Sequence, residues 1–338
     1  MNNKKTAFVT GATGLLGNNL VRALIEQGWR VRALVRSEEK GRRQFGDIAD
    51  IELVIGDMCN VPAFAKRLTG CDVLFHTAAY FRDNYKGGSH WEELKAINIE
   101  GTGHLLEQAY RADVRHFVHT SSIAVLNGEP GALLDETCLR STDNADAYYR
   151  SKILADQVAL DFLQCHPDMN GSLVLPGWMW GPGDLGPTSS GQLASEVLRG
   201  KLPGLVPGSF SIVDARDVAQ ALILAAERGK RGARYLAAGR HMTMRELVPL
   251  LGNIAGVKTP SRVLPLPLLY LLATLQEAYA RISGKPVLLS LATVRLMVRE
   301  ANRSHFNPAK SERELGLVFR PLEQTLQATL DWMRKRNA

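Results

Sequence analysis

The 338-residue sequence predicts an α/β fold in which a doubly wound parallel sheet is followed by a smaller, mainly helical C-terminal lobe. Short apolar runs alternate with amphipathic stretches through the first half, as in strands joined by helical crossovers. A glycine-rich turn follows the first apolar run, and glycine and proline become frequent between Gly177 and Gly208. We therefore divide the chain into residues 1–176, containing the sheet, and residues 177–338, which mainly form the lobe, with segments at about 210–240 returning to the sheet.

Six short apolar runs predict the strands, which are Thr6 to Thr10, Arg30 to Val35, Glu52 to Ile55, Val73 to His76, Phe117 to Thr120 and Ser172 to Leu175. A helix between the first two follows from the helical spacing of Leu16, Leu20, Val21 and Leu24. A second apolar stripe, expected to be core, consists of Leu322, Leu326, Leu330 and Met333.

The composition is that of a globular protein with no need for a polyanionic partner. Its 41 basic and 34 acidic residues give a charge of +7, but the basic residues are scattered, so we expect no nucleic-acid binding. The cysteines have neither C-x-x-C spacing nor nearby histidines, which predicts reduced thiols and no metal site. They are Cys59, Cys71, Cys138 and Cys165.

Two further features bear on location. The polar start, Met1 to Lys5, lacks the apolar core of a signal peptide, and we expect a cytoplasmic protein. The apolar stretch from Leu264 to Leu275 is shorter than the roughly 20 residues of a membrane span. We interpret it as a helix of the substrate lobe rather than an integral membrane segment, with loose contact to a membrane surface as the minor alternative.

The glycine-rich turn, Val-Thr-Gly-Ala-Thr-Gly-Leu-Leu-Gly from Val9 to Gly17, lies between a predicted strand and a predicted helix. Gly11 would permit the tight turn, Gly14 the approach of a pyrophosphate, and Gly17 close packing of the helix. This context predicts a Rossmann-type dinucleotide site, the alternative being a turn without a ligand. The expected contacts are Gly11, Thr13, Gly14, Leu15, Leu16 and Gly17.

The end of the second predicted strand bears on the choice of cofactor. An acidic residue there would bind a ribose diol and repel a 2′-phosphate, but Val35 occupies about that position. Arg36 follows, and its guanidinium can pair with a phosphate through two hydrogen bonds. NADP(H) is therefore favoured over NAD(H), unless Arg36 is only a solvated surface residue.

With these motifs in order, the sequence resembles the extended short-chain dehydrogenase/reductases, and within them the dihydroflavonol 4-reductase-like branch. The resemblance covers most of the chain. The motifs that carry it are the turn from Thr10 to Gly17, Gly56-Asp57-Met58, His76-Thr77-Ala78-Ala79, Asn98, Thr120-Ser121-Ser122, Tyr148-Tyr-Arg-Ser-Lys152, Pro176-Gly177-Trp178 and Val213 to Ala219.

The resemblance implies further roles. Asn98 would hold a water molecule or a helix near the active site, whereas Asp214 and Asp217 would be structural. A homodimer paired through a helix bundle would suit the family, although the sequence leaves the oligomeric state open. Asp57 and Met58 are implied to contact the adenine. Thr77, Ala78 and Ala79 would line the dinucleotide cleft, and Pro176 and Gly177 would lie near the nicotinamide amide.

Tyr148 and Lys152 are four residues apart and so share one face of a helix. A free phenol has a pKa of roughly 10, and a nearby ammonium group favours the phenolate. Tyr148 could then exchange a proton with a substrate near neutral pH, while Lys152 also holds the nicotinamide ribose. Tyr149 has no lysine at the matching offset, which argues against it.

Ser122 follows a predicted strand end and would orient and polarise the substrate oxygen. Ser121 is the competing assignment, and the resemblance favours the second serine of the pair. Nothing in the sequence matches the G-x-S-x-G turn of a serine hydrolase.

Large apolar residues near the predicted strand ends favour a hydrophobic or aromatic aldehyde or ketone, or the corresponding alcohol. The same residues could simply pack between the two lobes. They are Tyr80, Phe81, Ile123, Trp178, Met179 and Trp180.

Three alternatives to a carbonyl reductase stay open: a sugar-nucleotide epimerase, a hydroxysteroid-type dehydrogenase and a non-catalytic NADP(H) sensor. Dehydration is disfavoured, because Ile123 and Ala124 stand where a dehydratase would carry an Asp-Glu pair. The physiological substrate and the direction of reaction cannot be deduced from these residues.

Overall fold

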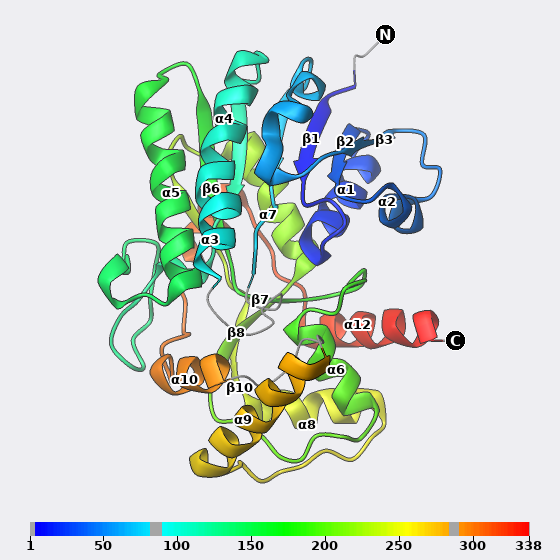
Figure 1. The fold of residues 1–338 in the computed structure, drawn as a ribbon, viewed down its shortest axis with the longest axis vertical. Helices are drawn as coiled ribbons and strands as arrows, with labels where there is room; N and C mark the ends of the chain where they lie inside the picture. Colours follow the sequence, from blue (N-terminus) through cyan, green and yellow to red (C-terminus); the bar gives the residue numbers. More distant parts are fainter. Residues whose placement is uncertain (1–3, 82–89, 284–290, 338) are drawn as a thin grey trace.

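A computed structural model describes residues 4–81, 90–283 and 291–337. Within them, the larger sheet has seven strands in the order β3-β2-β1-β4-β5-β6-β9, and all neighbours are parallel. The strands are β1 (Thr6–Thr10), β2 (Arg30–Val35), β3 (Ile51–Ile55), β4 (Val73–His76), β5 (His116–Thr120), β6 (Asn170–Pro176) and β9 (Arg234–Ala237). The predicted doubly wound parallel sheet is confirmed, and all six predicted strands occur (Figure 1).

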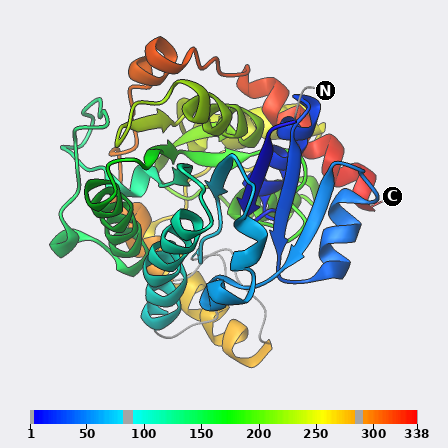
Figure 2. The same cartoon turned by 90° about the horizontal axis from the view of Figure 1, so that it is seen from above.

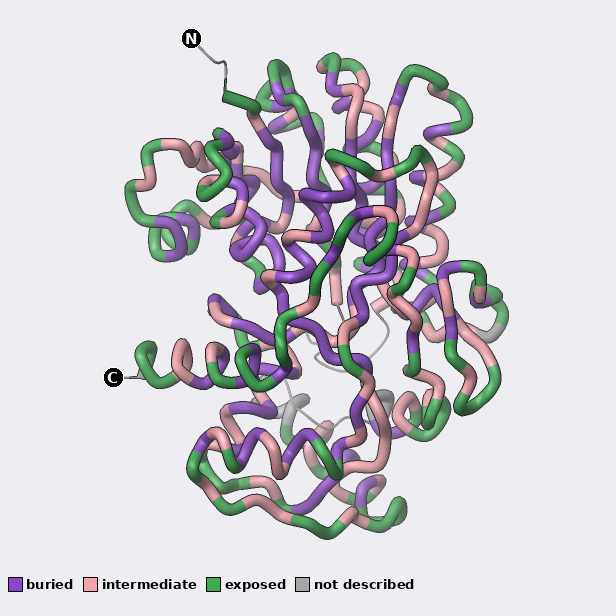
Figure 3. The backbone as a smooth tube through the Cα atoms, turned by 180° about the vertical axis from the view of Figure 1, so that it is seen from behind, coloured by how far each residue is buried: buried purple, intermediate pink, exposed green. Residues whose placement is uncertain are grey.

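Helices cover both faces of this sheet, as the unbroken runs of buried residues in β1, β4 and β6 require, because successive side chains point to opposite faces. In β1, Val9 packs in the cluster of helix α1 (Leu15–Glu26) and α7 (Ala215–Arg228), whereas Phe8 packs in the cluster of α4 (Gly101–Arg111). Figure 2 shows α7 and the pair α4 and α5 (Ala147–Cys165) on opposite sides of the sheet. In Figure 3 the buried residues concentrate along the strands between these layers.

The C-terminal lobe contains the predicted helices and also a small sheet that the sequence did not predict. Its three strands, in the order β10-β8-β7, are β7 (Trp178–Trp180), β8 (Ser209–Asp214) and β10 (Arg240–Thr243). The helices around it are α6 (Ser189–Leu198), α8 (Met244–Ala255), α9 (Leu266–Ser283), α10 (Leu291–Arg299) and α12 (Leu322–Asn337). The stripe on α12 is core as predicted, since Leu322, Leu326 and Leu330 are buried beside Trp180.

The larger sheet is completed by residues that follow β7 in sequence. Strand β9 pairs with β6, helix α7 packs against α1, and α11 (Ala309–Leu315) packs against α7. The chain therefore passes more than once between the sheet and the lobe. The remaining elements are α2 (Glu38–Phe45), α3 (Trp91–Leu94), η1 (Met58–Ala63), η2 (Ala65–Leu68), the π-helical η4 (Lys95–Glu100), η5 (Ile123–Val125) and η6 (Thr142–Asn144).

Helix α9 is the helix expected from the apolar stretch that begins at Leu264. One side packs on α10 through Leu269 and Ala273, while Leu271 and Leu275 are exposed. In the described part of the chain, no helix has both the length and the apolar character needed to cross a bilayer.

Candidate active site

The glycine turn connects β1 to α1, and close contacts explain two of its glycines. Gly11 has a φ of 65°, and a Cβ there would lie 2.8 Å from the backbone of Ala78. A Cβ on Gly17 would lie 2.2 Å from the carbonyl oxygen of Gly11, so the first turn of α1 packs directly on the glycine turn. A Cβ on Gly14 would come near only that same oxygen, at 3.3 Å, so the backbone of Gly14 is open to an approaching ligand.

The start of α1 suits an anion. Gly14 is the N-cap without a side-chain cap, and the first turn carries no acidic residue. Leu15, Leu16 and Gly17 therefore present backbone N–H groups at the positive end of the helix dipole. These residues fit the pyrophosphate of a dinucleotide.

Arg36 and Asp57 lie at the ends of neighbouring strands. Arg36 is exposed after β2, and Asp57 accepts a hydrogen bond from the backbone N–H of Cys59 at 2.8 Å. The pKa of the Cys59 thiol is raised by burial and by Asp57, and the positive charge of Arg36 opposes this shift. Arg36 is thus near enough to act on this pair. The side chain of Met58, which was predicted to contact the adenine, is buried in the core beneath α4.

A chain of hydrogen bonds runs inward from the turn through Thr10, His76 and Thr102. The hydroxyl of Thr10 accepts from the backbone N–H groups of Thr77 and Ala78, both at 3.1 Å. It therefore has its proton free to donate to Nδ1 of His76, at 2.8 Å. His76 Nε2 then donates to the hydroxyl of Thr102 at 2.9 Å.

This chain fixes His76 as a neutral imidazole protonated at Nε2. Burial above all, together with the neighbouring His119 and Lys152, holds the pKa of His76 well below its usual value. Thr102 in turn donates to the carbonyl oxygen of Asn98 at 2.6 Å. This chain of hydrogen bonds therefore runs from the glycine turn to the π-helical segment η4 through neutral groups.

Asn98 joins the loop after β4 to helix α5. Its side-chain oxygen accepts from the backbone N–H of Tyr80 at 2.7 Å, and its amide nitrogen donates to the Tyr80 carbonyl at 3.0 Å. The same nitrogen donates to Ser151 at 3.0 Å, and Ser151 donates to the carbonyl of Tyr148 at 2.8 Å. The amide of Asn98 thus holds α5 beside the loop after β4.

Tyr148 and Lys152 occupy one face of α5, near the carboxyl end of β5. Asp146 caps the helix by accepting from the backbone N–H of Tyr149 at 2.8 Å. Tyr148 is 7% exposed and Lys152 3%, and the Lys152 ammonium donates to the carbonyl of Thr120 at 2.7 Å. Burial lowers the pKa of Lys152 to about 8, against the opposing effect of Asp156.

The two serines after β5 have different surroundings. Ser121 is buried and donates to Oδ2 of Asp156 at 2.8 Å, so its hydroxyl is turned into the protein. Ser122 is partly exposed, and its hydroxyl accepts from the backbone N–H of Ala124 at 3.1 Å while keeping its own proton for another acceptor. This geometry favours Ser122 over Ser121 as the reactive hydroxyl.

Apolar side chains surround Tyr148. The ring of Phe81 lies edge-on to that of Tyr148, with centroids 4.7 Å apart. Tyr80 and Trp91 pack against the same cluster. Trp91, on the short helix α3, was not among the predicted site residues, and no motif marks it.

The predicted residues after β6 lie elsewhere. Trp180 is fully buried in the core of the lobe and presents no surface to a ligand, which differs from its predicted place in the substrate pocket. Trp178 is partly buried. Its ring is tilted against that of Phe210, with centroids 4.8 Å apart, and its indole N–H donates to Ser189 at 3.1 Å. Met179 packs against the cluster beneath α7, and Ile123 packs against a separate cluster that includes Val125.

Pro176 and Gly177 lie where the two sheets meet. Gly177 donates its backbone N–H to Ala237 at 3.0 Å, and a Cβ there would lie 2.6 Å from the carbonyl oxygen of Ser211. This close approach accounts for the glycine at position 177.

The loop after β4 contains the predicted cleft residues Thr77, Ala78 and Ala79. Thr77 donates its hydroxyl to the carbonyl of Thr10 at 2.6 Å.

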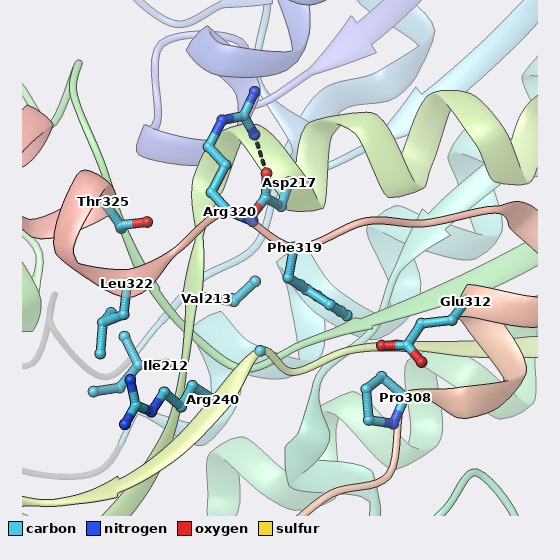
Figure 4. A pocket seen from close by; sticks show the side chains of 11 residues that line it. Ile212, Val213, Asp217, Arg240, Pro308, Glu312, Phe319, Arg320, Leu322 and Thr325 are labelled. Carbon is cyan, nitrogen blue, oxygen red and sulfur yellow. Dashed lines mark hydrogen bonds and ion pairs between the residues drawn. The ribbon is translucent and has the colours of Figure 1, made fainter.

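The segment from Val213 to Ala219 is a strand-to-helix junction. Asp214 caps α7 and pairs with Arg216 at 2.6 Å, and Asp217 pairs with Arg320 (Figure 4). Asp217 also borders a cavity of about 220 Å³ whose lining includes Arg240 and Phe319. None of the predicted catalytic, cofactor or substrate residues lines this cavity.

Comparison with known proteins places this chain in a family. A sequence profile of the NAD dependent epimerase/dehydratase family matches residues 7–238. A putative dihydroflavonol 4-reductase from Synechocystis sp. is 32% identical over 337 residues, covering 97% of this chain and 94% of that protein. Sterol demethylase protein B from Methylococcus capsulatus is 31% identical, covering 98% of this chain and 99% of that protein.

Among solved structures, the crystal structure of gox2253 has the same architecture. It is 32% identical and superposes with a TM-score of 0.82, with 99% of each chain covered. The resemblance to extended short-chain dehydrogenase/reductases of the dihydroflavonol 4-reductase-like branch is therefore confirmed at the level of the family.

Proposed function

The chain belongs to the NAD dependent epimerase/dehydratase family, and we propose that within it the protein is an NADP(H)-dependent oxidoreductase of carbonyl compounds and their alcohols. The observation that carries the proposal is the buried pair on α5. Lys152 is anchored on Thr120 one helical turn from Tyr148, at the carboxyl edge of the sheet where the glycine turn also lies. Ligands of open α/β sheets bind at this edge.

In this proposal the chain holds the cofactor at several points. The backbone N–H groups at the start of α1 take the pyrophosphate, and Arg36 takes the 2′-phosphate through a charge-assisted pair. Lys152 has two N–H donors besides the one directed at Thr120, and these suit the hydroxyls of the nicotinamide ribose. The cofactor, when bound, supplies or accepts the hydride.

The side chains handle the substrate oxygen and its proton. Ser122 donates a hydrogen bond to the carbonyl oxygen and orients it. In the reducing direction Tyr148 gives its phenolic proton to that oxygen, and the Lys152 ammonium stabilises the phenolate that remains. In the oxidising direction the same groups act in reverse.

We propose a hydrophobic substrate bound near Tyr148, Phe81 and Trp91. The apolar cluster around the Tyr148 ring supports this proposal. So does the relative named sterol demethylase protein B, because a sterol is a large apolar molecule. A sugar nucleotide would leave polar groups facing these rings, which disfavours the epimerase alternative.

A screen of aldehydes, ketones and alcohols with NADPH and NADH, followed at the nicotinamide absorbance, tests the activity. Stoichiometric consumption of NADPH with a carbonyl compound supports a reductase, whereas an epimerase would consume none. With an active substrate, Tyr148→Phe should lower turnover by about 10²- to 10⁴-fold, the contribution of a general acid, and leave NADPH affinity nearly unchanged.

Tyr110→Phe is the matched control, because Tyr110 lies on α4 and its hydroxyl donates to Asp168 at the surface. It should keep normal turnover. Near-normal turnover in Tyr148→Phe would contradict the proposed role of the phenol.

A further inference from the structure

Helix α5 carries a third ionisable side chain on the face of Tyr148 and Lys152. Asp156 follows Lys152 by four residues and is 2% exposed. A carboxylate taken out of water costs several kcal/mol unless positive charges and hydrogen bonds compensate it. The groups around Asp156 therefore indicate which positive charge its carboxylate compensates.

The neighbours of Asp156 come from two strands, β5 and β9, or from the residue directly after β5. Its Oδ2 accepts from Ser121 at 2.8 Å and lies 3.6 Å from Nε of Arg234, at the start of β9. Its Oδ1 lies 3.5 Å from Nε2 of His119 on β5 and has no hydrogen-bond partner among the described residues. The carboxylate is thus oriented by one hydroxyl.

Two histidines on neighbouring strands, His119 beside Asp156 and His76 beside His119, carry no charge at neutral pH. Burial lowers the pKa of His119, and His76, in register with it on β4, is also kept neutral. Among the described residues, two cations bear on Asp156: Arg234, 3.6 Å from its Oδ2, and Lys152, one helical turn earlier on the same face of α5. Arg234 is partly exposed and can be compensated by water, whereas Lys152 is buried and donates to a neutral carbonyl.

Lys152 accordingly needs a negative charge more than Arg234 does. Burial lowers the pKa of Lys152 to about 8, and Asp156 is the charged group that opposes this shift. Without that carboxylate, the lysine would lose its proton at a lower pH.

We propose that Asp156 is a positioning residue that acts through Lys152: its buried carboxylate, oriented by Ser121, keeps the Lys152 ammonium protonated beside Tyr148. The effect on catalysis rests on the proposed function, but the ionisation of Lys152 does not. If Asp156 merely paired with Arg234, it would stabilise the edge at β9 without affecting Lys152.

A double-mutant cycle of denaturant unfolding separates these two roles. Lys152→Met, Asp156→Asn and the double variant are compared with the wild type from pH 6 to pH 9.5. Below about pH 8 Lys152 is protonated, so the two substitutions should be coupled, and the coupling should fade as pH rises and the lysine loses its proton. No coupling, or a coupling independent of pH, would overturn the proposal.

The cycle has a matched control on the same helix. Asp161 is exposed and accepts from Gln157, so Asp161→Asn should show no coupling to Lys152→Met. If Asp156→Asn alone does not fold, adding Lys152→Met should restore folding, since the uncompensated buried cation is then gone. Failure of both variants to fold would count against the proposal.

Turnover gives the second readout. Protonated Lys152 is lost as pH rises, so the alkaline limb of the wild-type profile should move down by about one pH unit in Asp156→Asn and return in Asp156→Glu. An unmoved limb would overturn the proposal. Should the wild type show no nicotinamide-dependent turnover, the proposed function fails, and the unfolding cycle alone decides the charge pair.

Discussion

The glycine turn and the tryptophans of β7 differ in what fixes their residues. At the turn, backbone atoms of Gly11 and Ala78 lie where other side chains would begin, so position and residue type are bound together. At β7, Trp178 and Trp180 are both large and apolar, yet one is partly buried and the other lies fully in the core. A motif defined by backbone contact identifies a site, whereas apolar size alone does not say whether a residue faces a ligand or the protein interior.

The largest expected effect tests the lobe side of this comparison. Trp180→Ala should lower the free energy of unfolding by about 3–5 kcal/mol, because it empties a fully buried position. Trp178→Ala should cost less, since that side chain is already partly exposed. Urea unfolding measures both. A stable Trp180→Ala variant with a raised KM would instead put Trp180 in the substrate pocket.

The next effect tests the turn. Gly17→Ala places a Cβ 2.2 Å from the carbonyl oxygen of Gly11, so the turn has to shift. We expect a loss of about 1–3 kcal/mol in stability, as for other overpacked positions, together with weaker NADPH binding in a fluorescence titration. Gly103→Ala on α4 is the control, because its Cβ would meet Val158 at an ordinary 3.4 Å. Equal NADPH affinity in both variants would remove the argument from close contact.

The smallest effect asks whether an exposed residue can be assigned as securely as a glycine. Arg36→Ala should weaken NADPH binding about ten- to a hundredfold, the value of one charge-assisted contact, and leave NADH binding unchanged. Arg43→Ala, an exposed arginine on α2, should change neither affinity. Equal losses for NADPH and NADH would show that Arg36 does not read the 2′-phosphate.

Local patterns predicted the larger sheet, because the apolar runs of its strands and the residues of its turns are recognisable within a few consecutive positions. All six predicted strands occur. β1, β2 and β4 match the predicted bounds at both ends, and the ends of β3, β5 and β6 differ from the prediction by at most two residues. Strand β7 was not predicted, because it has only three residues and pairs with β8, more than thirty residues later in the sequence. The small sheet depends on pairings that no local period reveals.

The site was predicted unevenly for a related reason. The turn, Ser122, Tyr148 and Lys152 stand in recognisable motifs, but Thr102 and Asp156 look like ordinary polar residues on helices. Their partners become visible only through register, which aligns Thr10 with His76 and His76 with His119 across three strands. Asp156 did leave one signal, since it follows Lys152 at the same spacing as Lys152 follows Tyr148.

The return of α7 and β9 to the larger sheet constrains how such a protein can be recombined. A chimaera that exchanges the lobe with a relative cannot be made at a single junction after β6, since the donor would then also supply the partner of α1 and the edge strand beside β6. At least two junctions are required, one on each side of the segment from α7 to β9. Variation in the lobe can therefore be transplanted only as separate pieces.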